Sequence, residues 1–226
     1  MKTNKVVKTS NLAQLVSVAD RLTKVEAGVP GMGLVHGQRG LGKTTAAIWY
    51  AAQKANNTVY VRAKGDWSYS WMMEELLIEF GATPRRGDKA KYDDLINALL
   101  EKPRLIILDE ANQVSPKLIE TLRTINDMTH NPIMFIGHEG VVDKFRRQGP
   151  FFDRLLYIAE VKPITIDDLG RFAEECMEIG VDREALGKVL KLADGNFRRA
   201  VVKLKGFEDR AKGTLAKAIT AEMVKE

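Results

Sequence analysis

Apolar residues in the first two thirds of the chain alternate between short continuous runs and helical repeats. Continuous runs predict buried strands, and apolar residues three or four apart predict amphipathic helices. The predicted strands cover residues 33–36, 58–62, 105–108, 133–136 and 155–161. The predicted helices cover residues 10–28, 44–56, 71–80, 92–100 and 118–125. Strands that alternate with helices indicate a parallel sheet with right-handed crossovers.

The pattern changes after Pro163, where strand signals stop. Helical spacing recurs over residues 166–179, 182–193 and 196–207 and is expected to continue in a final segment to the C-terminus, with glycines between the segments. A chain of 226 residues has room for one α/β domain and a small appendage. We therefore expect an α/β domain over residues 1–163 and a helical lid domain over residues 164–226.

A glycine-rich loop follows the first predicted strand. Residues 37–44 read GQRGLGKT and match the P-loop motif at every fixed position, between a strand and a helix. Backbone N–H groups of such a loop converge on a phosphate, and the helix N-terminus adds partial positive charge. Lys43 is expected to reach the β- and γ-phosphates, and the Thr44 hydroxyl to ligate magnesium. The predicted ATP-binding residues here are Gly37, Gln38, Arg39, Gly40, Leu41, Gly42, Lys43, Thr44 and Thr45.

The apolar strand at residues 105–108 ends in two acids, Asp109 and Glu110. Asp109 lies at the carboxyl end of a buried strand, where it can hold Mg²⁺ through water. Glu110 can polarise the attacking water as a general base. The additional strand at residues 58–62, between the P-loop and the acids, argues against a kinase-like strand order. These residues predict ATP hydrolysis with ATP and Mg²⁺ as cofactors.

Together with an arginine just before the last strand and the segment GNFR at residues 195–198, these motifs resemble those of AAA+ ATPases. Within that superfamily the chain resembles the phage Mu transposition protein B family and related transposon target-selection ATPases, over roughly residues 10–226. The segments that support the narrower resemblance are ATPRR at 82–86, ILDEA at 107–111, IGH at 136–138 and FDRL at 152–155.

The resemblance implies roles for three further residues. His138 stands where the family tends to have asparagine, so it is expected to act as sensor I; a loop-capping role is the alternative. Arg154 stands at the position of the arginine finger, which completes the site of a neighbouring subunit, with Arg146 and Arg147 as competitors. Arg198 is expected to act as sensor II, a phosphate contact that couples the nucleotide to the lid.

A net charge of +5 permits contact with a polyanion. Basic residues gather between the second strand and the Asp-Glu strand: Lys64, Arg85, Arg86, Lys89 and Lys91. They predict contacts to the phosphates of duplex DNA without sequence preference, with a solvated basic turn as the alternative. The resemblance implies assembly with ATP into a ring or helical oligomer on DNA and regulation of a transposase. The family usually carries a helix-turn-helix ahead of the ATPase domain, whereas about ten residues precede the first predicted helix, so DNA contact is expected from the ATPase domain itself.

Composition limits the kinds of structural site and the cellular compartment that are expected. One cysteine, Cys176, and no Cys or His cluster at metal-ligand spacing exclude a disulfide framework and a zinc site. No signal-peptide pattern or membrane-length apolar run is present, so a cytoplasmic protein without membrane contact is expected. The same motifs also fit a helicase loader or replication-initiation ATPase, and a nucleotide-gated interaction module. Glu110 and Arg154 disfavour the module, since a switch without hydrolysis has little need of both.

Overall fold

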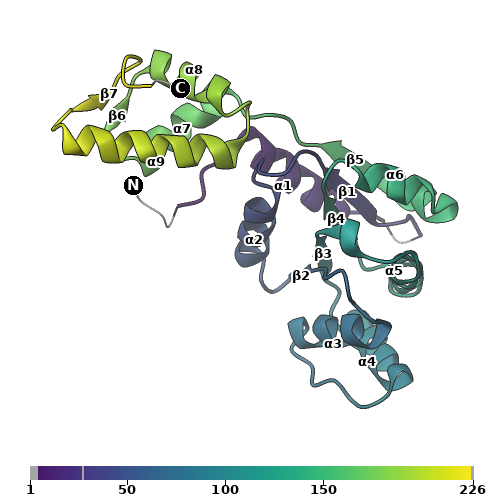
Figure 1. The fold of residues 1–226 in the computed structure, drawn as a ribbon. Coiled ribbons are helices and arrows are strands. Elements are labelled where there is room, and N and C mark those ends of the chain that lie inside the picture. Colours follow the sequence, from purple (N-terminus) through teal and green to yellow (C-terminus); the bar gives the residue numbers. More distant parts are fainter. Residues whose placement is uncertain (1–4, 27, 225–226) are drawn as a thin grey trace. The chain divides into compact units, whose positions relative to one another are not determined.

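The computed structural model describes residues 5–26 and 28–224 (Figure 1). The chain divides into two compact units. The sheet unit consists of residues 15–37 and 47–160, and the helical unit joins the described parts of 1–14 and 161–226 to residues 38–46. Helices α1 (Ser10–Leu22) and α2 (Lys43–Gln53) have residues in both units.

The sheet unit contains five parallel strands in the order β2-β3-β4-β1-β5. Their bounds are β1 (Met32–His36), β2 (Thr58–Arg62), β3 (Leu105–Asp109), β4 (Ile133–Gly137) and β5 (Leu155–Glu160). Strands β3 and β4 are buried along their whole length, as their continuous apolar runs require. The edge strand β5 instead exposes every second residue. The prediction of a parallel α/β sheet is confirmed.

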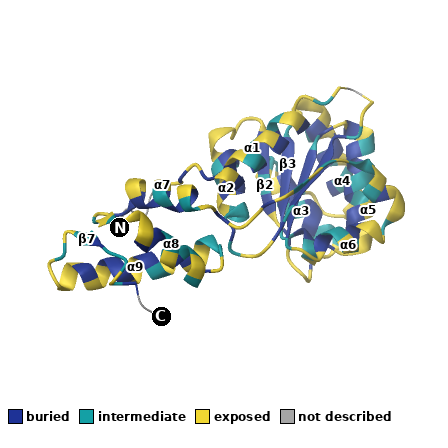
Figure 2. Ribbon diagram, turned by 90° about the horizontal axis from the view of Figure 1, so that it is seen from above, coloured by how far each residue is buried: buried dark blue, intermediate teal, exposed yellow. Residues whose placement is uncertain are grey.

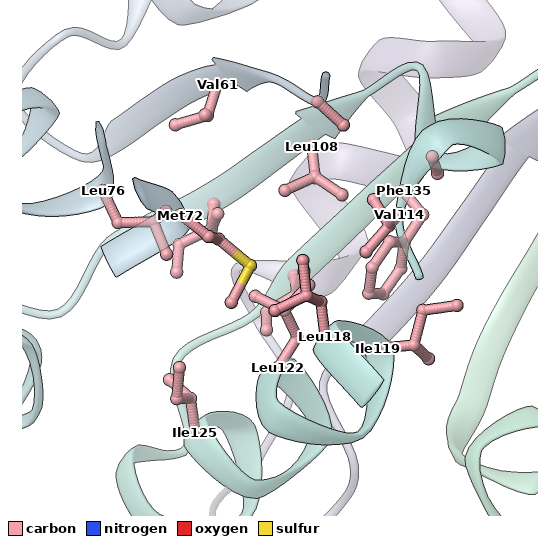
Figure 3. Packing of buried hydrophobic residues seen from close by; sticks show 14 of the residues in the cluster. Val61, Met72, Leu76, Leu108, Val114, Leu118, Ile119, Leu122, Ile125 and Phe135 are labelled. Atoms are coloured by element: carbon pink, nitrogen blue, oxygen red, sulfur yellow. The ribbon is translucent and has the colours of Figure 1, made fainter. Parts of the chain in front are cut away.

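Helices connect the strands and cover the sheet. They are α3 (Tyr69–Glu79), α4 (Asp88–Glu101), α5 (Pro116–Thr129) and α6 (Val141–Arg146), with two short 3-10 helices, η1 (Ala111–Gln113) and η2 (Gly149–Arg154). Met72 of α3 and Leu118 of α5 belong to one buried cluster with Leu108 and Phe135 of the strands (Figure 3). This cluster supports β3 and β4, whose carboxyl ends carry the predicted site residues.

Strand register places those ends together. His36 of β1 is paired with Gly137 of β4, and Arg62 of β2 with Asp109 of β3. Because all five strands are parallel, their carboxyl ends meet at one sheet edge. The residues that follow β1, β3 and β4 therefore leave the sheet on the same side.

The helical unit contains α7 (Ile166–Cys176), α8 (Arg183–Leu192) and α9 (Phe197–Gly213), with a two-stranded parallel ladder of β6 (Gly180–Val181) and β7 (Ala218–Ile219). Their inward faces form a second apolar core, which also contains Val7. The expected helix at the C-terminus is wrong for residues 214–224. Leu215 has a left-handed backbone (φ 56°), and β7 pairs with β6 instead of continuing the helix. The expected extension of the first helix to Gly28 is also wrong, since α1 ends at Leu22.

The N-terminal segment is tied to α7. Asp168 is buried and receives hydrogen bonds from the Ser10 N–H (2.8 Å) and hydroxyl (2.7 Å). It also accepts the Thr165 N–H (3.1 Å) in a capping box at the start of α7. Burial alone would raise the pKa of Asp168, but the hydrogen bonds from Ser10 and Thr165 outweigh it, and the pKa lies below its usual value.

Across the described residues, no helix is long and apolar enough to cross a membrane.

Candidate functional site

The P-loop connects β1 to α2. Gly37, Gly40 and Gly42 have φ values of 143°, 83° and 89°, a region that glycine enters without steric cost. Helix α2 begins at Lys43, so the first N–H groups of the helix lie at the end of the loop and lack intrahelical acceptors. The Lys43 ammonium group donates to the Gln38 carbonyl at 2.7 Å. A turn of this kind, with a cation and the positive end of a helix, binds phosphate.

Residues at the start of α9 contact the P-loop directly. The Asn196 side chain donates to the Arg39 carbonyl (2.6 Å), and the Arg198 N–H donates to the Gly40 carbonyl (3.0 Å). A Cβ at Gly40 would lie 2.7 Å from Asn196 Nδ2, so glycine is required here by the contact as well as by its φ. The predicted sensor residue Arg198 is thus joined to the P-loop by its backbone, and its side chain is exposed.

A small cavity of about 60 Å³ lies within the helical unit beside the P-loop. It is lined by Lys5, Val6, Val7, Thr9, Leu12, Gly42, Thr45, Ala46, Phe172 and Phe197. The rings of Phe172 and Phe197 meet edge to face, with centroids 5.4 Å apart. Asn11 fixes the adjoining N-terminal segment by donating to the Lys162 carbonyl (2.8 Å) and, more weakly, to the Leu41 carbonyl (3.3 Å). The recess is mainly apolar and adjoins the phosphate loop. Sequence reasoning missed this recess because its walls come from segments far apart in the chain.

Asp109 is the last residue of β3 and is 2% exposed. Its carboxylate accepts hydrogen bonds from the Tyr60 hydroxyl (2.9 Å) and from the Glu110 N–H (2.8 Å). Burial and the negative charge of Asp109 raise the pKa of Tyr60 above its usual value, so the phenol stays protonated and donates. Glu110 has a left-handed backbone (φ 54°, ψ 41°), a costly conformation for a residue other than glycine. Backbone strain at this position is consistent with a functional role for Glu110.

The Glu110 carboxylate is paired with Arg62, the last residue of β2. The Arg62 guanidinium lies 3.3 Å from Glu110 Oε1, and the two side chains are 61% and 30% exposed. Arg62 therefore occupies one oxygen of the predicted general base. Sequence analysis missed Arg62 and Tyr60, although both lie on the strand next to β3.

His138 follows β4 and is held by Asn112. The His138 N–H donates to Asn112 Oδ1 (2.8 Å), and Asn112 Nδ2 lies 3.2 Å from ring Nδ1. An amide nitrogen can only donate, so Nδ1 accepts and a neutral His138 carries its proton on Nε2. Lys144 of α6 donates to the Asn112 carbonyl (2.6 Å), and burial lowers the pKa of Lys144. Asn112 thus orients the predicted sensor and joins it to α6, a role with no local sequence signal.

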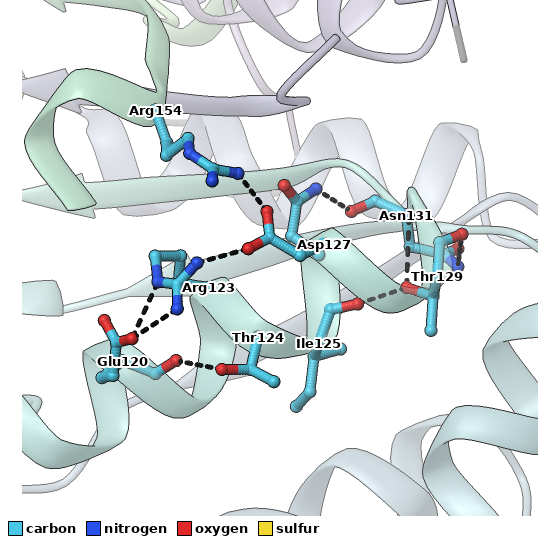
Figure 4. Close-up of polar contacts among 9 residues, drawn as sticks. Glu120, Arg123, Thr124, Ile125, Asp127, Thr129, Asn131 and Arg154 are labelled. Carbon is cyan, nitrogen blue, oxygen red and sulfur yellow. Dashed lines mark hydrogen bonds and ion pairs between the residues drawn. The ribbon is translucent and has the colours of Figure 1, made fainter. Parts of the chain in front are cut away.

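The three candidate arginine fingers differ in their surroundings. Arg154 is paired with Asp127, which also binds Arg123, in a chain of ion pairs along α5 (Figure 4). To act on a neighbouring subunit, Arg154 must leave Asp127. Arg146 is 64% exposed; it forms a 3.7 Å ion pair with Asp143 one turn away and lies 5.7 Å from the centroid of the Phe152 ring. Arg147 is exposed.

Three of the five predicted DNA contacts already have carboxylate partners. The pairs are Lys64 with Glu75, Arg85 with Asp94, and Lys91 with Glu74. Lys91 is buried, so its charge is not offered to a surface ligand. Arg86 and Lys89 are exposed and have no ion pair within the described part of the chain. The basic loop therefore presents less free positive charge than the sequence predicts.

A glycine loop leading into a helix, an Asp-Glu pair after a buried parallel strand, and the strand order β2-β3-β4-β1-β5 define a P-loop ATPase fold. Residues 27–145, just over half of the chain, match the family model described as AAA domain. The chain belongs to this family.

Solved structures share the fold. Cdc6p from Pyrobaculum aerophilum matches with a TM-score of 0.74 and 16% identity, over 96% of this chain and 66% of that one. Orc1 from Aeropyrum pernix, solved in complex with DNA, matches with a TM-score of 0.68 and 18% identity, over 96% of this chain and 64% of that one. The RuvB Holliday junction branch migration motor from Thermotoga maritima matches with a TM-score of 0.63 and 17% identity, over 96% of this chain and 67% of that one. The chain thus spans about two thirds of the length of these proteins.

No match to a curated protein was found. The resemblance to AAA+ ATPases is confirmed by the family match and the fold. The narrower resemblance to the Mu transposition protein B family rests on the sequence motifs alone.

Proposed function

We propose that this chain binds ATP with Mg²⁺ and hydrolyses it. The observation that carries the proposal is the P-loop geometry, three positive-φ glycines followed at once by the start of α2. β1 leads into this loop and ends at the same sheet edge as β3, which supports action of Asp109 and Glu110 on the same nucleotide. Lys43 and the loop N–H groups bind the phosphates.

The residues present fit a magnesium ion bound together with ATP. Thr44 offers a hydroxyl on the first turn of α2, and Asp109 offers a buried carboxylate. Within the described residues, no group of three or more His, Cys, Asp or Glu side chains could hold a metal alone. Mg²⁺ commonly uses one or two protein oxygens, with waters and phosphates completing its shell. When bound, the ion neutralises charge on the phosphates during phosphoryl transfer.

Glu110 accepts the proton of the attacking water. The ion pair with Arg62 restrains the Glu110 side chain. In the pair described above, Glu110 Oε1 is engaged by Arg62, so opening of this pair frees that oxygen for the attacking water. His138, as the Nε2–H tautomer set by Asn112, donates to a phosphate oxygen or to the water. An arginine from a neighbouring subunit stabilises the charge that develops on the γ-phosphoryl group. The resemblance favours Arg154, and exposure favours Arg146 or Arg147.

We infer a finer function from the sequence resemblance and the charge. The ATP-bound chain assembles with itself on duplex DNA without sequence preference and regulates a transposase, in the cytoplasm of a bacterium or of a phage-infected host cell. The net charge of +5 supports contact with DNA. The fold shared with Orc1, whose structure contains DNA, and with Cdc6p keeps a replication-initiation or helicase-loading ATPase as the second candidate.

Two variants test the chemistry. Lys43→Ala is expected to abolish ATP binding, whereas Glu110→Gln is expected to bind ATP and trap it unhydrolysed. Binding is measured with a fluorescent ATP analogue and turnover by phosphate release. Normal turnover in Glu110→Gln contradicts the assignment of the base.

Electron microscopy of the Glu110→Gln protein with ATP and a long duplex then tests assembly. Regular filaments or rings on DNA support the finer function. Naked duplexes, with ATP bound, contradict it. Co-purification with a transposase or with a helicase separates the two candidates.

A further inference from the structure

Helix α9 carries more positive charge than any motif considered above requires. Its 17 residues include six basic and two acidic side chains. One of the acids, Glu208, is buried and accepts the Glu178 N–H at 2.8 Å. The buried face of α9 is formed by Ala200, Leu204, Phe207, Glu208 and Ala211, so every cation of this helix lies outside that face.

Helical geometry arranges these cations in two rows. At 100° per residue, Arg198, Lys205 and Lys212 form one row, and Arg199, Lys203 and Arg210 form the other. Between the rows lies a strip of Val202, Gly206, Asp209 and Gly213, directly opposite the buried face. Exposed positions recur along this helix in Figure 2, and Val202 is 67% exposed.

Most of these charges have no acidic partner. Of the six, Lys212 alone forms an ion pair within the described part of the chain, with Glu178 at 2.8 Å. Arg210 lies over the Phe207 ring, 5.7 Å from its centroid. The other four cations have no ion pair among the residues that the structure describes. Cations that are already paired, as in the loop at residues 64–91, must give up a carboxylate before they bind phosphate, whereas those of α9 need not.

The strip between the rows contains two glycines, Gly206 and Gly213, and two exposed side chains, Val202 and Asp209. A Cβ at Gly206 would meet nothing within 4 Å, so packing inside the protein does not require glycine there. Glycine inside a helix lowers its stability, and its benefit is that another molecule can approach the backbone closely. The two rows together carry six cations against one exposed acid, Asp209, so this side of α9 is complementary to a polyanion that lies along the helix.

We propose that the basic face of α9, formed by the exposed Arg199, Lys205 and Arg210 and the partly buried Lys203, binds the phosphate backbone of duplex DNA. Residues seven positions apart on a helix are separated by about 10 Å along its axis. Over that distance duplex DNA presents roughly six phosphates, at one charge per about 1.7 Å. Acidic lipid is disfavoured as the partner, since the apolar face that an interfacial helix would insert is already buried in the core of the helical unit.

The same helix couples this surface to the nucleotide. Its first residues donate to the P-loop through Asn196 and Arg198, and its remaining turns carry the basic face. The contacts to the P-loop and the basic face therefore belong to one helix. The inference rests on the proposed function, because it places the DNA contact of a DNA-binding ATPase.

The test compares two triple variants that remove the same charge. Lys203→Ala/Lys205→Ala/Arg210→Ala alters the α9 face. Lys24→Ala/Lys54→Ala/Lys102→Ala removes three exposed lysines of the sheet unit. A third variant, Arg86→Ala/Lys89→Ala, tests the loop predicted from the sequence. Binding to a fluorescent duplex of mixed sequence is measured with ATP at several salt concentrations, and binding of a fluorescent ATP analogue checks that each protein is folded.

The α9 variant is expected to bind duplex at least about tenfold more weakly than the parent near 0.1 M salt, with the slope of log K against log salt reduced by about 2.7. The sheet-unit control is expected to keep the parent's slope. Equal affinity and slope in the α9 variant and the control overturn the α9 proposal but leave DNA binding intact. A parent that binds ATP but no duplex at low salt overturns the proposed DNA function itself. Binding to acidic vesicles instead of duplex, lost in the α9 variant, assigns the surface to lipid and overturns the proposal as well.

Discussion

Removal of the Arg62 side chain tests whether this residue restrains the general base. The pair joins Arg62 to Glu110 Oε1 at 3.3 Å, and both side chains are partly exposed. Exposed ion pairs contribute about 0.2–1 kcal/mol. If Glu110 reaches the attacking water only when the pair is open, Arg62→Ala removes the free energy that keeps the pair closed. The fraction of molecules with an unpaired Glu110 then rises accordingly. Since about 1.4 kcal/mol corresponds to a factor of ten, turnover of bound ATP is expected to rise by roughly 1.5- to 5-fold.

The assay is phosphate release at saturating ATP, with nucleotide affinity measured separately. Lys64→Ala is the matched control, because it breaks a similarly exposed ion pair, with Glu75, just beyond the same strand without touching Glu110. Its turnover is expected to equal that of the parent. A lower kcat for Arg62→Ala with unchanged ATP affinity refutes the restraint and shows that Arg62 assists the reaction.

Three further outcomes are expected. Arg154→Ala subunits bind ATP and hydrolyse it slowly, and mixing them with Glu110→Gln subunits restores part of the activity. If this mixture stays inactive, while a mixture of Arg146→Ala and Glu110→Gln subunits regains activity, the finger is Arg146. Gly40→Ala destabilises the protein by about 1–3 kcal/mol in urea unfolding, because φ is 83° and the added Cβ lies 2.7 Å from Asn196 Nδ2; an unchanged midpoint would mean that this contact is absent in solution. The lowered pKa of Asp168 stabilises the fold above pH about 4, where the unfolded carboxyl is ionised, and this contribution is lost as the pH falls through the lower folded pKa. Asp168→Asn therefore costs stability at pH 7 and has a smaller effect at pH 3, and an equal loss at both pH values counts against the charge of Asp168.

Local patterns in the sequence determined much of the fold. The run at residues 105–108 predicted a buried strand because its residues are apolar on both faces, and β3 is buried throughout. The P-loop was predictable for a similar reason, since its glycines, Lys43 and Thr44 are consecutive residues between a strand and a helix. The acids after β3 followed from the same logic. Each of these features depends on neighbours in the chain.

Tertiary structure decided which residues meet those motifs. Tyr60 and Arg62 reach Asp109 and Glu110 because β2 pairs with β3, and nothing in either segment alone specifies that register. Asn112 reaches the sensor His138 across 26 positions of sequence. Contacts of this kind arise from packing between segments distant in the chain, so periodicity and motif spacing do not reveal them.

The charged residues also show what the sequence determines and what the tertiary structure decides. The sequence predicted DNA contacts at Lys64, Arg85, Arg86, Lys89 and Lys91, between β2 and β3. Folding then paired Lys64, Arg85 and Lys91 with carboxylates from neighbouring turns and helices, while the outer face of α9 kept most of its cations unpaired. The sequence determined how many charges the chain carries and on which elements. Only the tertiary structure decided which of them remain available to a partner, because availability depends on the acids that packing brings within reach.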